Sequence, residues 1–113
     1  MPLAVIEIVS TADRLPVLGY TLVERGKLIG MTAVVIDGTP EIGQLLVEAG
    51  IMRGGRGAPF KAAILLREYV YVGRLAFWNS SLELNPGDEL YLEIRGAEVY
   101  RVRMVGFVEL EGG

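Results

Sequence analysis

The chain has 113 residues and a formal net charge of −3; 51% of its residues are hydrophobic and 22% are charged. This length fits one domain, and the apolar fraction excludes a wholly disordered chain. The acidic balance excludes a basic field over the whole surface, so any binding to nucleic acid has to come from a local patch.

Cysteine and histidine are both absent. Without cysteine the chain has no disulfide, thiolate metal site or cysteine nucleophile. Without histidine it lacks the commonest general base and the commonest zinc ligand. We therefore expect a non-enzymatic protein without cofactor or metal. Arginine outnumbers lysine and aliphatic residues are plentiful, a composition that leans towards a heat-adapted source.

The first residues, Met1–Glu7, have no basic stretch ahead of their apolar run, unlike a signal peptide. No apolar run approaches the ~18 residues that a membrane-spanning helix needs. We expect a soluble chain without membrane contact, located in the cytoplasm, or in a virion if the protein is a viral structural protein.

Three strands are predicted in the first third of the chain. Leu3–Val9, Val17–Glu24 and Leu28–Asp37 are rich in valine, isoleucine and leucine and are separated by polar turns. Within the third strand, Gly30 indicates a bulge or a close contact.

One short helix is predicted near residues 40–49. Thr39 suits the cap of a helix and Pro40 its first position, and Gly50 would end it. The apolar side chains of this segment recur at helical spacing, which defines one face made of Ile42, Leu45, Leu46 and Ala49.

The second half of the chain reads as further strands, at Ala62–Leu66, Tyr69–Trp78, Glu89–Ile94 and Val99–Leu110. The last two are expected to pair as a hairpin. The fold class predicted is therefore all-β or mainly β: a single domain over residues 1–113, forming a small barrel of about six to seven strands with one short helix.

The middle stretch Gly50–Lys61 is predicted to be a glycine-rich basic loop. It carries several glycines and three basic residues and no acid. Backbone N–H groups freed by glycine, together with basic side chains, can bind a phosphate, a carboxylate or a nucleic-acid backbone. A contact to a partner subunit and a solvated hairpin connection are the alternatives. The candidate binding residues are Arg53, Gly54, Gly55, Arg56, Gly57 and Lys61.

Aromatic residues follow this loop. Tyr69 and Tyr71 share one strand face, and Trp78 ends the same predicted strand. They could stack bases or ligand rings beside the loop. Core packing or a protein interface is the alternative that aromatic side chains usually adopt.

The segment Leu82–Ile94 contains the turn Pro86-Gly87-Asp88 followed by alternating apolar residues. Pro-Gly favours a turn with a positive φ, and Asp88 can accept backbone hydrogen bonds across it. This segment resembles the GD box of cradle-loop barrels, a group that includes double-psi barrels, riboflavin-kinase-like barrels and swapped-hairpin DNA-binding transition-state regulators. The resemblance implies a barrel with a structural turn and supplies no catalytic residue.

Two functions follow from these observations. The first is a non-enzymatic interaction module whose basic loop contacts an anionic ligand, a nucleic acid or a partner subunit. The second is a homo-oligomeric structural subunit of a coat, filament or scaffold, because the chain combines a high apolar fraction with few lysines. Self-association is expected in either case.

Overall fold

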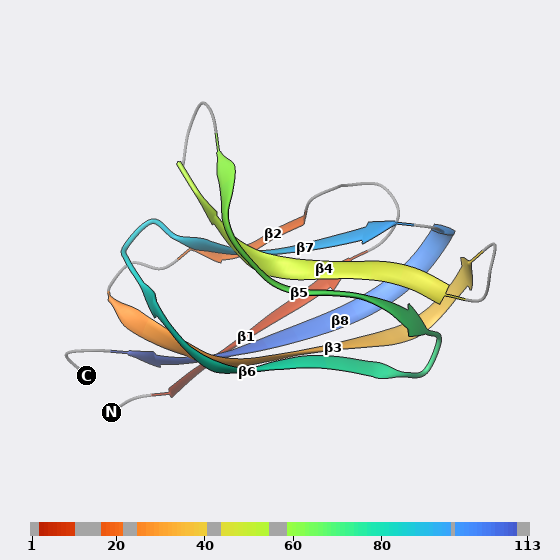
Figure 1. Ribbon diagram of the computed structural model, residues 1–113, viewed down its shortest axis with the longest axis horizontal. Coiled ribbons are helices and arrows are strands. Elements are labelled where there is room, and N and C mark those ends of the chain that lie inside the picture. The colour runs from red at the N-terminus through yellow and green to blue at the C-terminus, as the bar shows by residue number, and fades with distance from the viewer. Residues whose placement is uncertain are drawn as a thin grey trace.

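The computed structural model describes residues 3–10, 17–21, 25–40, 44–54, 59–95 and 97–110. Within these ranges the regular elements are eight β-strands, and no helix occurs. The strands are β1 (Leu3–Ser10), β2 (Val17–Thr21), β3 (Gly26–Pro40), β4 (Gln44–Arg53), β5 (Phe60–Tyr71), β6 (Leu75–Leu84), β7 (Glu89–Arg95) and β8 (Ala97–Leu110) (Figure 1). The predicted all-β class is confirmed.

The strands form two antiparallel four-stranded sheets, in the orders β1-β8-β3-β6 and β2-β7-β4-β5. The two sheets face each other as layers (Figure 1), and this strand order is that of a double-sheet jelly roll. The predicted small barrel is wrong, because the strands form two separate sheets that each end at edge strands. Alternating apolar residues do not separate the two architectures, since sandwich strands and barrel strands both bury one face.

The predicted helix near residues 40–49 is wrong. β3 runs to Pro40, and β4 begins at Gln44. Leu45, Val47 and Ala49 are buried and alternate along β4, which is the period of a strand. The same apolar run also fits helical spacing. The ladders to β5 and β7 on either side of β4 satisfy its backbone and favour the strand.

Both ends of the predicted loop at residues 50–61 belong to paired strands. β4 continues to Arg53, β5 starts at Phe60, and Met52 pairs with Lys61. Gly50 lies inside β4 and ends no helix. A Cβ at Gly50 would meet the carbonyl oxygen of Ala63 at 2.1 Å, so the close approach of the two strands there requires glycine.

The sequence predicts a hairpin between the last two strands, and this pairing is wrong. β7 pairs with β2 and β4, whereas β8 pairs with β1 and β3 in the other sheet. The bulge expected at Gly30 is confirmed, because the register of β3 shifts between Leu28 and Gly30 against both neighbours. The described part of the chain contains no helix long and apolar enough to cross a membrane.

The core lies between the two sheets. Inward side chains of both sheets meet there and are nearly inaccessible to solvent, among them Leu28, Met31, Val35, Leu45, Val47, Ile51, Leu90, Leu92, Ile94, Val102, Met104 and Val108. Because side chains alternate along a strand, the residues between these positions point outward. The outward side chains of the two sheets are therefore the ones available to contact other molecules.

Candidate functional site

The outer face of the β2-β7-β4-β5 sheet holds two buried carboxylates. Glu48 of β4 and Glu93 of β7 are direct cross-strand partners, and only 5% and 7% of their surfaces are exposed. Lys61 of β5 reaches both: its Nζ donates to Glu48 Oε2 and, at 3.0 Å, to Glu93 Oε2. One ammonium therefore bridges two carboxylates and offsets their mutual repulsion.

Three further side chains complete this cluster. The Tyr91 hydroxyl donates to Glu48 Oε2 at 3.1 Å, and Arg67 Nε donates to Glu48 Oε1 at 3.0 Å. Arg95 Nε donates to Glu93 at 3.4 Å. The Lys61 ammonium also lies 5.4 Å from the centre of the Tyr91 ring, within the range of a cation–π contact. We name these six residues the carboxylate–lysine cluster.

Contacts within the cluster shift the pKa values of Glu48, Lys61 and Tyr91. Burial tends to raise the pKa of Glu48, but the hydrogen bonds from Lys61 and Tyr91 outweigh burial and hold that pKa below its ordinary value. The hydrogen bond to Glu48 raises the pKa of Lys61. Burial, with the negative charge of Glu48, raises the pKa of Tyr91. The cluster is thus charged and internally paired at neutral pH, as a structural network requires.

A second ion pair lies at the turn between β6 and β7. Arg53 donates from Nε and Nη2 to the two carboxylate oxygens of Asp88, at 2.8 and 3.0 Å. Asp88 also accepts a hydrogen bond from the backbone N–H of Asn85 at 2.9 Å, and Gly87 has a φ of +92°. The positive φ and the backbone hydrogen bond predicted for this turn are both confirmed.

Within the described part of the chain, the residues of the predicted binding loop are not brought together into one site. Arg53 and Lys61 belong to the strands of the hairpin and are paired with carboxylates of the same chain. Gly54 follows β4 with a φ of +112°. The other three, Gly55, Arg56 and Gly57, lie outside the described residues.

The three predicted aromatic residues lie on different surfaces. Tyr69 and Tyr71 are 61% and 56% exposed on β5, on the same outer face as the carboxylate–lysine cluster. Trp78 belongs to β6 in the other sheet. It pairs with Met31, packs against the core and is half-buried. The fold therefore separates Trp78 from the two tyrosines.

Sequence reasoning missed an apolar surface on the outer face of the β1-β8-β3-β6 sheet. Arg103 of β8 points outward on this sheet, between Val9 and Val34. Around it are uncharged outward side chains that are half-buried or exposed: Val5, Val9, Thr32, Val34, Leu75, Phe77, Val105 and Phe107. We call this set the apolar face. The signal lay in the outward positions of β8, where Val105 and Phe107 interrupt a series of charged residues.

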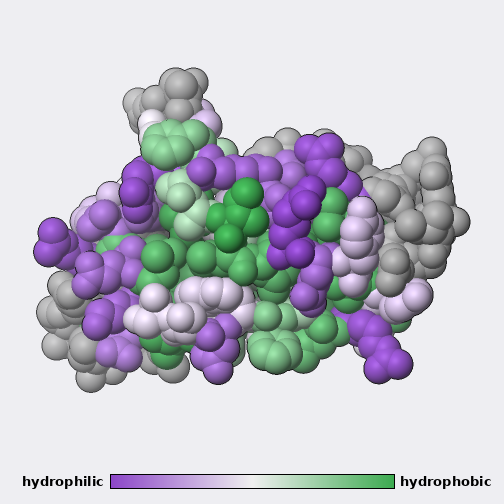
Figure 2. All heavy atoms as spheres, viewed as in Figure 1, coloured by the Kyte–Doolittle hydropathy of each residue, from purple (hydrophilic) through white to green (hydrophobic). Residues whose placement is uncertain are grey.

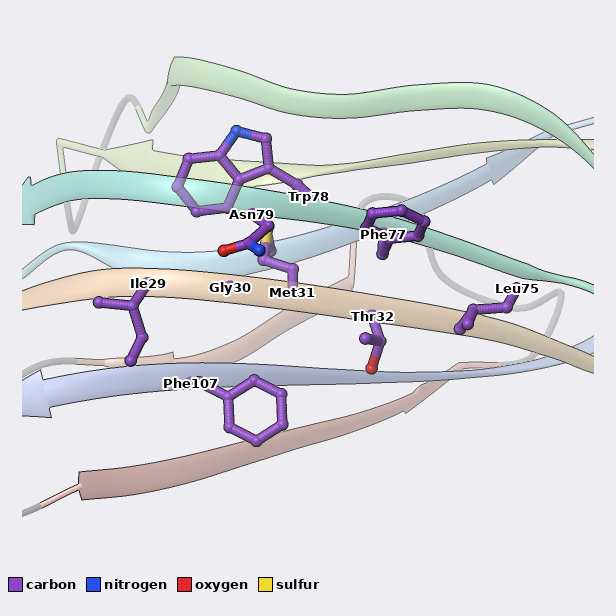
Figure 3. A pocket seen from close by; sticks show the side chains of 9 residues that line it. All are labelled: Ile29, Gly30, Met31, Thr32, Leu75, Phe77, Trp78, Asn79 and Phe107. Atoms are coloured by element: carbon purple, nitrogen blue, oxygen red, sulfur yellow. The ribbon is translucent and has the colours of Figure 1, made fainter.

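A hollow of about 320 Å³ is set into the apolar face (Figure 3). It is lined by Ile29, Gly30, Met31, Thr32, Leu75, Phe77, Trp78, Asn79 and Phe107. Gly30 leaves it open: a Cβ there would have only ordinary contacts, at 3.6 Å to the Trp78 carbonyl oxygen and 3.8 Å to Phe107. The hollow is therefore a shape feature that an apolar side chain of a partner can fill.

No protein-family model and no curated protein matches the chain. The function proposed below therefore rests on the geometry of the chain itself.

Proposed function

We propose that the protein is a non-enzymatic subunit that associates with further copies of itself, as a component of a coat, filament or scaffold. The observation that carries this proposal is the amount of large apolar surface that the single chain leaves exposed. The exposed side chains are Val5, Val9, Ile36, Phe60, Ile64, Tyr69, Tyr71, Val72, Leu75 and Phe77.

Most of these side chains lie on edge strands of the two sheets. Val5 and Val9 lie on β1 and Leu75 and Phe77 on β6, the two edges of one sheet, and others lie along β5, an edge of the other sheet. Figure 2 shows hydrophobic side chains across the middle of the molecule, with hydrophilic side chains around them. Single exposed apolar residues are normal in monomers, but contiguous apolar patches rimmed by polar residues mark interaction sites.

The architecture is compatible with this proposal. Double-sheet jelly rolls occur in viral capsid proteins, in lectins and in cupins. A fold shared by such different proteins does not by itself select a function. The exposed apolar surface favours a self-assembling subunit over a lectin or a cupin.

The geometry gives less support to an anion-binding loop. Two of its three cations, Arg53 and Lys61, are already bound to buried carboxylates. A phosphate would have to displace these carboxylates and leave them buried without partners, which is costly. An interaction module of this kind would depend mainly on Arg56.

Light scattering after size exclusion, at low and moderate salt, tests the proposal. Absorbance at 260 and 280 nm is recorded together with the mass. We expect a discrete oligomer or a polymer without bound nucleic acid. A clean monomer at high concentration would contradict the proposal. A monomer carrying 260 nm material that salt removes would favour the basic loop instead; Arg53→Ala with Arg56→Ala should then abolish that binding.

A further inference from the structure

We propose that the apolar face packs against the same face of a second copy, around a two-fold axis that lies between the two sheets. This inference rests on the proposed function and adds which surface mediates the assembly. Two sheets that pack face to face lie ~10 Å apart with their side chains interdigitated. The partner is thus a second copy of this chain, in an isologous contact.

The register of the sheet shows how the apolar face is composed. Across its middle, Thr32 of β3 lies between Val105 of β8 and Phe77 of β6. In the next row Val34 lies between Arg103 of β8 and Leu75 of β6. Apart from Arg103, these neighbours are uncharged, and Phe77 is 67% exposed. Such a largely uncharged centre resembles the desolvated core of a protein interface.

Charged residues border the apolar face at both ends of its strands. At one end Glu109 of β8 pairs with Lys27 of β3. At the other end Arg101 of β8 pairs with Asp37 of β3. Glu83 of β6 also pairs with Lys27, so the first end row alternates acid, base and acid, and the second holds one acid and one base. This is the arrangement of a polar rim.

This rim is complementary to itself. If the two-fold axis runs across the strands, Glu109 lies opposite Arg101 of the second copy, and Lys27 lies opposite Asp37. If the axis runs along the strands, Glu109 lies opposite Lys27 and Arg101 lies opposite Asp37. Unlike charges meet in both arrangements, which favours association between copies and suppresses other partners. A balanced rim of this kind does not suit nucleic acid, which needs an excess of positive charge.

The shape of the face suits the same partner. The hollow at Gly30 lies opposite Val34 of the second copy in one arrangement and opposite Phe107 in the other, and either side chain can enter it. Four strands at ~4.8 Å and four outward rows at ~6.8 Å cover a plane on the order of 500 Å². Two such planes together cover on the order of 1,000 Å², at the low end of specific protein–protein interfaces.

The first test compares Phe77→Glu with Phe60→Glu in the full chain. Both remove an exposed phenylalanine, but Phe60 lies outside the apolar face, 54% exposed on β5. We expect Phe77→Glu to raise the dissociation constant of the assembly about a hundredfold or more, and Phe60→Glu to leave it unchanged. Light scattering over a dilution series measures both, and circular dichroism checks that both variants fold.

The second test uses the absence of cysteine from the chain. Thr32→Cys places one thiol near the proposed axis, and Tyr69→Cys places one on the outer face of the other sheet. A short bismaleimide cross-linker should join Thr32→Cys into covalent dimers and leave Tyr69→Cys monomeric. This test does not depend on destabilising the interface.

The outcomes separate the inference from the proposed function. A wild-type monomer would overturn both. An oligomer that withstands Phe77→Glu, dissociates with Phe60→Glu, or cross-links through Tyr69→Cys alone would overturn the apolar-face contact. In that case the proposed function would stand with a different interface.

Discussion

Glu48 of β4 and Glu93 of β7 are directly opposed in the antiparallel ladder, and both carboxylates accept hydrogen bonds from the ammonium of Lys61. Like charges opposed across a sheet are destabilising, and burial increases the cost of leaving either one unpaired. Because Lys61 belongs to β5, its contacts join three neighbouring strands of one sheet. The hairpin that was expected to bind an external anion is thereby tied to the sheet by its own cation.

Replacing Lys61 by an uncharged residue should lower the stability of the fold. Lys61→Met keeps most of the length of the side chain but leaves two nearly buried carboxylates facing each other. We expect the free energy of unfolding to fall by about 2–3 kcal/mol, below the cost for a fully buried pair because Lys61 is partly exposed. Urea unfolding at neutral pH measures the loss.

Arg67→Met is the matched control. Arg67 also binds Glu48, but its side chain is 58% exposed, and exposed ion pairs contribute less than about 1 kcal/mol. Equal losses of unfolding free energy for Lys61→Met and Arg67→Met would contradict the conclusion that Lys61 stabilises the cluster more than Arg67 does.

The pH dependence of stability should show a decline in acid. The pKa of Glu48 lies below its ordinary 4.5 and that of Asp88 below its ordinary 3.8. Since the folded chain binds these protons less readily than the unfolded chain, the stability that they contribute is complete above these values. It is lost as pH falls through the lower folded pKa values.

At alkaline pH the stability should change in the opposite direction and fall as pH rises. The pKa of Lys61 is raised above its ordinary 10.5, so the stability that Lys61 contributes is complete below that pH and is lost above it. Urea midpoints measured from about pH 2 to pH 11 should be flat near neutrality. Stability that rises on acidification below pH 4.5 would contradict these assignments.

Gly50→Ala tests the close approach of β4 and β5. The added Cβ would lie 2.1 Å from the backbone oxygen of Ala63. Moving the backbone of β5 away would cost much free energy. We expect a loss of about 3 kcal/mol. In Gly106→Ala the added Cβ meets only flexible side-chain ends, that of Leu90 at 2.9 Å and that of Leu28 at an ordinary 3.6 Å, and the loss should be about 1 kcal/mol. Thermal unfolding of both variants checks the order, and a reversed order would contradict the packing described here.

Gly30→Ala should separate folding from assembly. The new methyl group makes only ordinary contacts within the chain, and replacing glycine in a strand stabilises the fold by about 0.5 kcal/mol. The same methyl group partly fills the hollow of the apolar face. We expect the dissociation constant of the assembly to rise about fivefold, by light scattering over a dilution series. A dissociation constant that falls as the fold becomes more stable would contradict the role proposed for the hollow.

Much of the strand content followed from the sequence. Valine-rich and isoleucine-rich segments with period-two alternation marked the strands in both halves of the chain, and Pro86-Gly87-Asp88 marked a turn that the structure contains. These are local signals, set by backbone preference and by alternate burial. For the same reason the bulge at Gly30 could be located.

Pairing partners could not be predicted in this way. β4 has an apolar run that fits a helix and a strand equally well, and only its ladders to β5 and β7 distinguish the two. The carboxylate–lysine cluster joins Glu48, Lys61 and Glu93, which are far apart in sequence. Their partnership depends on strand order, and no local pattern encodes it. The apolar face was missed because Val105 and Phe107 stand outward among charged neighbours.

Side-chain footprinting with hydroxyl radicals, read by mass spectrometry, tests most directly whether copies meet through the apolar face. The chain is labelled at concentrations above and below the midpoint of assembly. Phe77 and Phe107 should lose reactivity on assembly, whereas Phe60 and Tyr69 should keep theirs. Protection of Phe60 and Tyr69 with unchanged labelling of Phe77 and Phe107 would contradict it.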